Sequence, residues 1–203
     1  TLIIFANNIL PDTTDISITG SGGFNINGFN ETVNSISGTG GSITLSSGTL
    51  TTGGTGNTTF SGSFNGDGNL VKQGTGTFTL AGANATTGTF TINAGILNIA
   101  SAGGLGSSGF HPTLVTVANG AALQLSTSTI TEAPNSLHLN GTGIASGGAL
   151  VANNSVTYQG AITLDTASSI NVVGGATTLT LSGAINGVSG FDKIGAGTLV
   201  LSN

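Results

Sequence analysis

The sequence is built on a short unit in which strands of alternating polarity are separated by glycine corners. Its clearest copy covers residues 66–99, where threonines alternate with Gly76, Phe78 and Leu80. This period of two predicts a strand with one wet face and one buried face. Two more strands of the same kind follow within the unit, with glycines at the turns between them. The unit therefore predicts three short strands joined by sharp corners.

The same unit returns over residues 187–203. It aligns with the first copy without a gap, and the two lysines of the chain fall at the same place in the unit. We expect the residues that define the unit to be structural, because glycines permit corners and large apolar side chains fill a core. These residues are Gly66, Lys72, Gly74, Gly76, Phe78, Leu80 and Gly95 in the first copy, and Gly187, Lys193, Gly195, Gly197, Leu199 and Leu201 in the second.

Both segments resemble the autotransporter-associated β-strand repeat, also called the passenger-associated transport repeat. Its pattern runs roughly G-x-L-x-K-x-G-x-G-T-L-x-L-x-G-x-N. The sequence departs from the family after Asn84, where an aromatic residue is frequent but the chain continues with Ala85 and Thr86. It also departs at Phe191 and Asp192, which replace an apolar–polar pair. The resemblance covers residues 60–203. It implies a secreted bacterial surface protein whose repeats help the passenger to cross the outer membrane and to fold outside it.

Short apolar pairs recur along the whole chain at intervals of about eight residues, a spacing that fits a β-sandwich, a barrel or a β-helix. No window predicts an amphipathic helix, since threonine and glycine are everywhere. The long repeat favours the β-helix, in which each coil pairs with its neighbours. We therefore expect one all-β domain over residues 1–203, a right-handed parallel β-helix of about eight or nine coils. A loop excursion is expected at residues 100–112.

Charge is scarce, with two lysines, no arginine and seven acidic residues among 203, so that 4% of residues are charged against roughly 25% in ordinary domains. Such a chain cannot neutralise a run of phosphates, which argues against nucleic acid and anionic membranes as partners. No cysteine is present, so disulfides and thiolate metal sites are excluded. The apolar start, Leu2 to Phe5, is too short to insert into a membrane.

Catalytic and metal-binding patterns are weak. The seven acidic residues show no spacing that demands a pair, although a solenoid can bring distant carboxylates together. Residues 65–69 resemble the start of a calcium loop, but Leu70 and Gly76 stand where its glycine and glutamate belong. His111 and His138 have no second ligand near them in the sequence. The sequence therefore predicts no cofactor, no metal and no catalytic residue.

The N-terminal run of Leu2, Ile3, Ile4 and Phe5 has no alternation, which predicts a strand buried on both faces or covered at the end of the stack. Neither end of the sequence shows a polar cap, and open strand edges invite another subunit.

Three functions remain open. The preferred one is a non-catalytic stalk or adhesin segment at the bacterial cell surface, contacting a host or neighbouring cell. The second is an extracellular fibre of copies joined end to end, in which this N-terminal strand completes a neighbour's coil. The third, given low weight, is a polysaccharide-active enzyme.

Overall fold

Parallel strands wind around one axis in the computed structural model, which describes residues 1–106, 109–110, 112–130 and 136–202. Each turn visits three faces. The first face is a nine-stranded sheet of β2 (Asp15–Ile18), β5 (Ser35–Gly38), β8 (Thr58–Phe60), β11 (Thr77–Leu80), β14 (Gly95–Ile99), β16 (Ala121–Leu125), β18 (Leu150–Ala152), β21 (Ser168–Val172) and β24 (Phe191–Ile194).

The second face is an eight-stranded sheet of β4 (Glu31–Val33), β7 (Thr49–Thr52), β10 (Asn69–Lys72), β13 (Thr89–Ile92), β15 (Leu114–Val117), β17 (Ser136–Leu139), β20 (Ala161–Leu164) and β23 (Ile185–Gly187). The third face carries two separate sheets, one after the other along the axis of the solenoid. These are β1 (Leu2–Ile3), β3 (Gly23–Asn25), β6 (Ser42–Thr44), β9 (Ser63–Gly66) and β12 (Ala85–Thr86), then β19 (Val156–Tyr158), β22 (Thr178–Leu181) and β25 (Thr198–Leu201).

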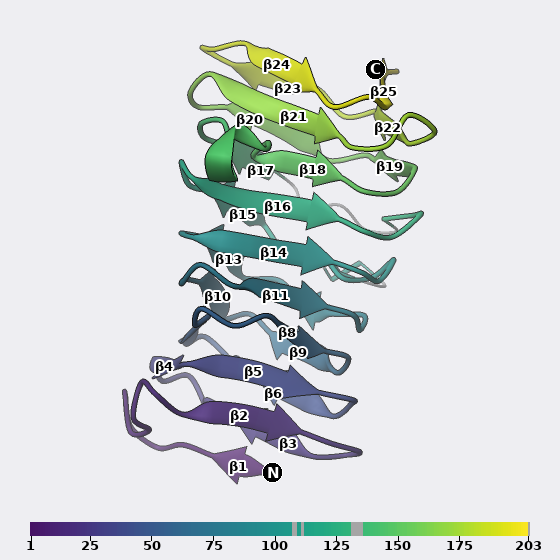
Figure 1. The fold of residues 1–203 in the computed structure, drawn as a ribbon. Coiled ribbons are helices and arrows are strands. Elements are labelled where there is room, and N and C mark those ends of the chain that lie inside the picture. The colour runs from purple at the N-terminus through teal and green to yellow at the C-terminus, as the bar shows by residue number, and fades with distance from the viewer. Residues whose placement is uncertain (107–108, 111, 131–135, 203) are drawn as a thin grey trace.

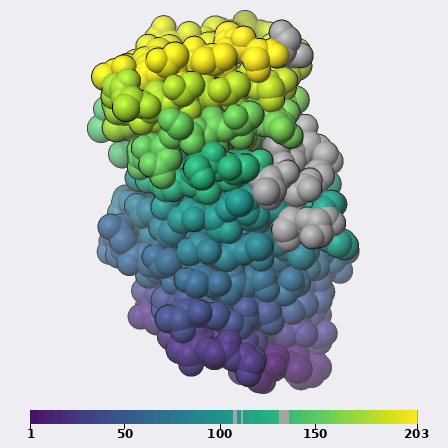
Figure 2. All heavy atoms as spheres, turned by 90° about the vertical axis from the view of Figure 1, so that its right-hand side faces the viewer, coloured from purple at the N-terminus to yellow at the C-terminus, as the bar shows by residue number. Residues whose placement is uncertain are grey.

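The winding is right-handed. Figure 1 shows the nine-stranded sheet nearest the viewer, with its arrows running from left to right while the chain climbs from the N-terminus to the C-terminus. Nine strands in that sheet correspond to about nine turns. In Figure 2 the colours lie in successive layers, so each stretch of sequence packs on its sequence neighbours. The predicted right-handed parallel β-helix of eight or nine coils is confirmed.

Turn length is 19–23 residues in the nine-stranded sheet where all three faces carry strands; Phe78 pairs with Leu97 and Ile170 with Lys193, for example. Two turns are longer, because Leu97 pairs with Leu123 and Leu123 pairs with Leu150, offsets of 26 and 27 residues. Among the described residues of these turns, no strand lies between β14 and β15 or between β16 and β17. This interruption divides the third face into its five-stranded and three-stranded sheets.

The expected excursion at 100–112 lies in the first of the longer turns, and residues 107–108 and 111 of it fall outside the described residues. Its first half turns tightly, since Gly104 N–H donates to Ser101 O and Gly106 N–H to Gly103 O. Leu105 is buried in the core. The described beginning of this segment therefore contributes a side chain to the core of the solenoid.

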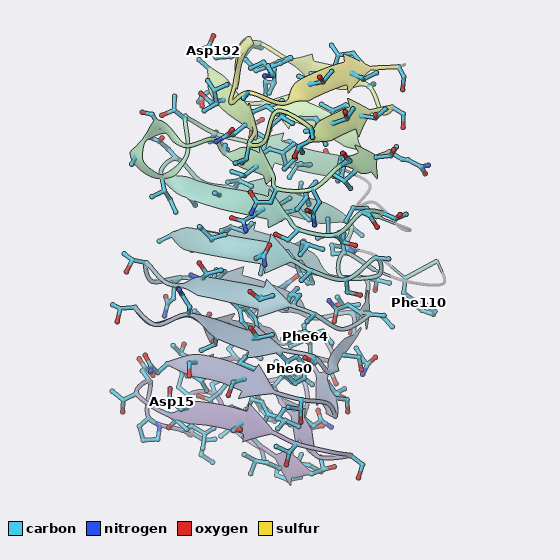
Figure 3. The ribbon with its side chains drawn as sticks, turned by 45° about the vertical axis from the view of Figure 1, so that its right-hand side comes forward. Asp15, Phe60, Phe64, Phe110 and Asp192 are labelled. Atoms are coloured by element: carbon cyan, nitrogen blue, oxygen red, sulfur yellow. The ribbon has the colours of Figure 1, made fainter. Side chains whose placement is uncertain are left out.

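The core is the column of inward side chains that alternation places inside each strand. On β10, β11 and β13 the burial pattern alternates between partly exposed and buried residues. Three phenyl rings pack edge to face across the interior: Phe60 and Phe64 have centroids 5.5 Å apart at 76°, and Phe64 and Phe78 lie 6.3 Å apart at 81°. Figure 3 labels Phe60 and Phe64 inside the stack, whereas Phe110 points away from it.

Helix is almost absent from the described residues. A single 3₁₀ turn, η1 (Ile144–Ser146), lies outside the sheets, and no described helix has the length and apolar character needed to span a membrane. Ala145 and Ser146 both have positive φ, 48° and 60°. The loop around η1 is held by Asn171 Nδ2, which donates to Gly147 O at 2.7 Å.

The N-terminal strand departs from expectation. β1 pairs in parallel with β3 of the same chain, with Leu2 beside Phe24. Ile4 is buried, but Phe5 is 71% exposed and Leu2 and Ile3 are also exposed, so the prediction of a strand buried on both faces is wrong for three of its four residues. The reason is its position beneath the first complete turn, where no strand of the described chain covers its lower edge.

Candidate functional site

The predicted structural unit forms a corner between the eight-stranded and nine-stranded sheets. β10 ends at Lys72, residues 73–76 make the turn, and β11 carries Phe78 and Leu80 into the core. The alternation that points Leu70 inward also points Lys72 inward, and only 1% of Lys72 is exposed. A cation therefore lies inside an apolar solenoid, which makes this corner the best candidate for a functional site.

Backbone carbonyls hold the Lys72 ammonium group. Nζ donates to Gln73 O at 2.7 Å, to Gly74 O at 2.8 Å and to Ala94 O at 3.1 Å. An ammonium has three N–H donors, so each has an acceptor. No carboxylate pairs with it in the described part of the chain. Burial lowers the pKa of Lys72 to about 8, although the three carbonyls favour its charged form.

Glycines make room for this arrangement. Gly74 and Gly95 adopt φ of 69° and 67°, in the left-handed region that side chains disfavour. A Cβ at Gly95 would lie 2.7 Å from Lys72 Nζ and would also meet the Gly74 carbonyl. A Cβ at Gly74 would in turn meet the carbonyl of Gly53, one turn earlier. The corner glycines thus form a column in which each backbone lies directly against the next.

The second copy of the unit lies on a different corner. β24 belongs to the nine-stranded sheet and β25 to the three-stranded sheet, so the copy is displaced by one face of the solenoid. Its local geometry is preserved: Gly187 and Gly195 have φ of 126° and 78°, and Lys193 Nζ donates to Gly195 O at 2.6 Å. Lys193 and Leu201 are exposed, whereas Leu199 is partly buried, in the last described turn.

The sequence reasoning missed a set of asparagines that join successive turns. Asn30, Asn57 and Asn69 each use Oδ1 to accept the backbone N–H of a threonine 19 or 20 residues later, at 2.8 or 2.9 Å. The available signal was the recurrence of asparagine one turn before threonine at the start of a strand. These bonds satisfy strand N–H groups at the corners, so the asparagines are structural.

Glu31 and Asp15, two of the described acidic residues, are each held by hydrogen bonds of their own. Glu31 is buried, and its carboxylate accepts the N–H groups of Ile9 and Leu10 at 3.0 and 3.3 Å. Hydrogen bonds from Ser35 and Asn34 lower the pKa of Asp15. Neither arrangement provides a pair of carboxylates facing a substrate.

The histidine that the structure describes, His138, lies on the outer face of the eight-stranded sheet. Its Nδ1 is 3.0 Å from Asp165 Oδ2, and Asn140 Nδ2 is 3.4 Å from the same oxygen. His111 and Glu132 fall outside the described residues. Among those that are described, no group of three histidine, cysteine, aspartate or glutamate residues could hold a metal ion.

Hollows on the described surface are small and carry little charge. One of about 260 Å³ is lined by residues of β19 and β22 together with Ser128 and Ser155, and one of about 230 Å³ lies between the nine-stranded sheet and η1. A third, of about 220 Å³, has the single carboxylate of Asp192. None of these hollows brings two charged groups together, so their geometry suits surface contact better than acid–base chemistry.

Comparison with known proteins gives one match. The model of the family described as the passenger-associated-transport-repeat matches residues 70–99, the segment that contains Lys72, the corner glycines and Phe78. No curated protein and no solved structure matches the chain. Residues 70–99 therefore match the passenger-associated transport repeat, and this segment is set within a parallel β-solenoid.

Proposed function

We propose that this chain is a structural, non-catalytic segment of an autotransporter passenger, displayed on the outside of a bacterial cell. The observation that carries the proposal is the match of the transport-repeat model to residues 70–99, which form β10 to β14 within the stack of parallel turns. Such a segment acts as a stalk: it extends away from the cell and presents its outer faces for contact with another surface.

In this proposal, folding of the solenoid outside the cell supports transport of the chain across the outer membrane. A turn gains apolar burial and backbone pairing only when its neighbour is already formed, so the solenoid grows along its axis from a folded end. With 4% charged residues, few side chains carry a large desolvation penalty while the unfolded chain passes through a narrow pore. Progressive folding outside the cell would then hinder return of the chain.

A polysaccharide-active enzyme is less well supported. Hydrolysis of a glycosidic bond uses two carboxylates that flank the scissile bond. In the described chain, Glu31 is occupied by backbone N–H groups, Asp15 by two side chains and Asp165 by His138. The separate engagement of these carboxylates favours the structural function.

Surface display tests the proposal. Residues 1–203 are fused between a signal peptide and an autotransporter translocator barrel, and exposure on intact cells is measured by protease accessibility. We expect display of the native sequence and reduced display of Phe90→Asp, which places a charge in the core. Thr91→Asp, on the outer face of the same strand, is the matched control. Equal display of all three chains would contradict a role for folding.

End-to-end assembly is a second candidate, favoured by apolar side chains exposed at both ends of the described stack. Phe5 is 71% exposed at one end and Leu201 is 57% exposed at the other. At the second end, β23, β24 and β25 each have one unpaired edge. Electron microscopy and light scattering of the purified chain test this: uniform fibres would support it, and a monomer at high concentration would contradict it.

A further inference from the structure

We propose that Lys72 sets the register in which the following turn docks, and is thus a positioning residue for assembly of the solenoid. The structure contains the same lysine corner twice. At Lys72, the following turn of the described chain stacks on the corner and places Ile92 beside the lysine. The proposal concerns how the turns assemble, and it holds whether or not the chain is exported.

The two corners differ by two hydrogen bonds, one within the corner and one to the next turn. Lys193 Nζ donates to Gly195 O, two residues later, and its side chain is exposed. Lys72 makes the equivalent bond to Gly74 O, and it also donates to Gln73 O in the same corner and to Ala94 O, 22 residues later. At Lys72, two acceptors therefore come from its own corner, and the next turn supplies the third.

The solenoid needs a residue that marks the native register of each turn, because the alternation of polar and apolar residues alone defines this register poorly. A slip of one residue turns the apolar side chains outward, but a slip of two residues keeps them inside. Where β13 lies on β10, Phe90 stands beside Leu70 and Ile92 beside Lys72. After a two-residue slip, apolar groups would again face apolar groups at most positions. Burial would then discriminate weakly between the two registers.

The ammonium and the corner glycine discriminate strongly. A slipped turn that covers Lys72 without presenting a carbonyl leaves a charged donor buried and unpaired, which is strongly unfavourable. The native turn also places Gly95 at the point where a Cβ would lie 2.7 Å from Nζ. A shift by two residues brings Asn93 or Leu97 there. A single buried polar residue fixes register in coiled coils in the same way, at some expense of stability.

Apolar replacements of Lys72 are expected to fit. Thr52 stands below it and Ile92 above it in the same inward column, so the site accepts uncharged side chains in the neighbouring turns. No described residue of β7, β13 or β14 brings a charged group to the ammonium. Lys72→Ile and Lys72→Met therefore remove the marker while keeping an inward side chain of similar length or shape.

Disulfide trapping measures register directly, because the chain has no cysteine of its own. Cysteines at Val71 and Thr91 occupy outward positions that are paired in register. Cysteines at Val71 and Thr89 report a two-residue slip. Adjacent strands lie about 4.8 Å apart, within the Cα range of a disulfide, whereas the diagonal pair lies beyond it. Each pair is refolded and oxidised, and the crosslinked fraction is measured by gel and mass spectrometry.

With Lys72 present, we expect the 71–91 crosslink and almost none at 71–89. In Lys72→Ile and Lys72→Met, the ratio of slipped to native crosslink should rise on the order of tenfold or more, as expected for loss of one hydrogen bond to a charged group. Lys193→Met is the control and should leave the ratio unchanged. An unchanged ratio in folded Lys72 variants would overturn the proposal.

A second measurement leaves the core sequence intact. The cysteine pairs with native Lys72 are refolded at pH 6 and at pH 10.5, then brought to one pH for oxidation. The neutral amine has one donor fewer than the ammonium, so the slipped crosslink should increase after refolding at pH 10.5. Equal ratios from the two refolding conditions would contradict the proposed role, even if neither Lys72 variant folds.

Discussion

Asn84 Oδ1 accepts the backbone N–H of Phe64 at 2.8 Å inside the solenoid, one turn away along the axis. On its other side, Asn84 Nδ2 donates to Gly104 O at 2.7 Å. The side chain is 1% exposed, so an amide in the interior links three successive turns on the third face. It does so where the five-stranded sheet ends and no strand continues the hydrogen-bond ladder in the described residues.

Replacing Asn84 by leucine should destabilise the fold by about 2–5 kcal/mol, because a buried N–H and a buried C=O would each lose a partner. Urea unfolding followed by far-UV circular dichroism measures the change. Asn153→Leu is the control: Asn153 is exposed, and its substitution should alter stability by less than about 0.5 kcal/mol. Equal stability of Asn84→Leu and the native chain would show that this bridge is dispensable.

Corner glycines should differ in their tolerance of alanine according to what surrounds them. At Gly95, a Cβ combines positive φ with contacts to Lys72 Nζ and the Gly74 carbonyl, so Gly95→Ala should cost several kcal/mol. At Gly120, φ is 82° and the added Cβ would meet open space. Alanine there should therefore destabilise the fold only by the strain of a left-handed backbone, about 1–2 kcal/mol.

Gly175→Ala provides the neutral reference for these two variants. Gly175 lacks positive φ, and its added Cβ would have no atom within 4 Å. Alanine there should be neutral or slightly stabilising, since it restricts the unfolded chain. The three free energies of unfolding should therefore rank Gly175→Ala above Gly120→Ala, with Gly95→Ala lowest. Any other order would contradict the packing of the glycine column.

Much of the fold could be predicted because alternation directly encodes which side chains face inward. At residues 77–80 the sequence itself shows that threonine faces outward and that phenylalanine and leucine face inward. Glycine marks the corners. The place of a unit in the turn was less accessible. The copies at 66–99 and 187–203 encode the same strand, corner and strand, yet they lie on different corners. A local pattern defines a bend, but the lengths of all preceding turns determine which face it reaches.

The lysine site illustrates the same limit. The sequence placed Lys72 in a structural unit, but its third acceptor, Ala94 O, is 22 residues away and depends on the length of the turn. Asn84 was equally difficult to interpret, since an asparagine in a turn-rich stretch normally indicates a surface corner. Its burial follows from the interrupted sheet above it, which no local pattern reveals.

The phenyl cluster should be a centre of stability. Phe64 is buried and packs edge to face against both Phe60 and Phe78. Phe64→Ala should destabilise the chain by about 3–5 kcal/mol through lost burial and a residual cavity. Phe110→Ala removes a ring that is 51% exposed and should change stability far less. If the two variants unfold at the same urea concentration, the phenyl cluster does not make the proposed contribution to stability.

The depressed pKa of Lys72 predicts a stability that rises with pH. Burial lowers this pKa to about 8 in the folded state, against about 10.4 in the unfolded chain. Between these values the unfolded state binds more protons, so the free energy of unfolding increases with pH. The gain is on the order of 2–3 kcal/mol across the interval. Burial also raises the pKa of Tyr158, which reduces stability above about pH 10.

The two titrations are separated by comparing the native chain with Lys72→Met, in which Tyr158 is retained. The difference between their free energies of unfolding should be flat below about pH 8 and should shift in favour of the native chain from there to about pH 10.4. At pH 7, where the native chain keeps a charged lysine in its core, Lys72→Met should be at least as stable. A difference that is constant from pH 6 to pH 10 would mean that the three carbonyls offset burial and leave Lys72 with an ordinary pKa.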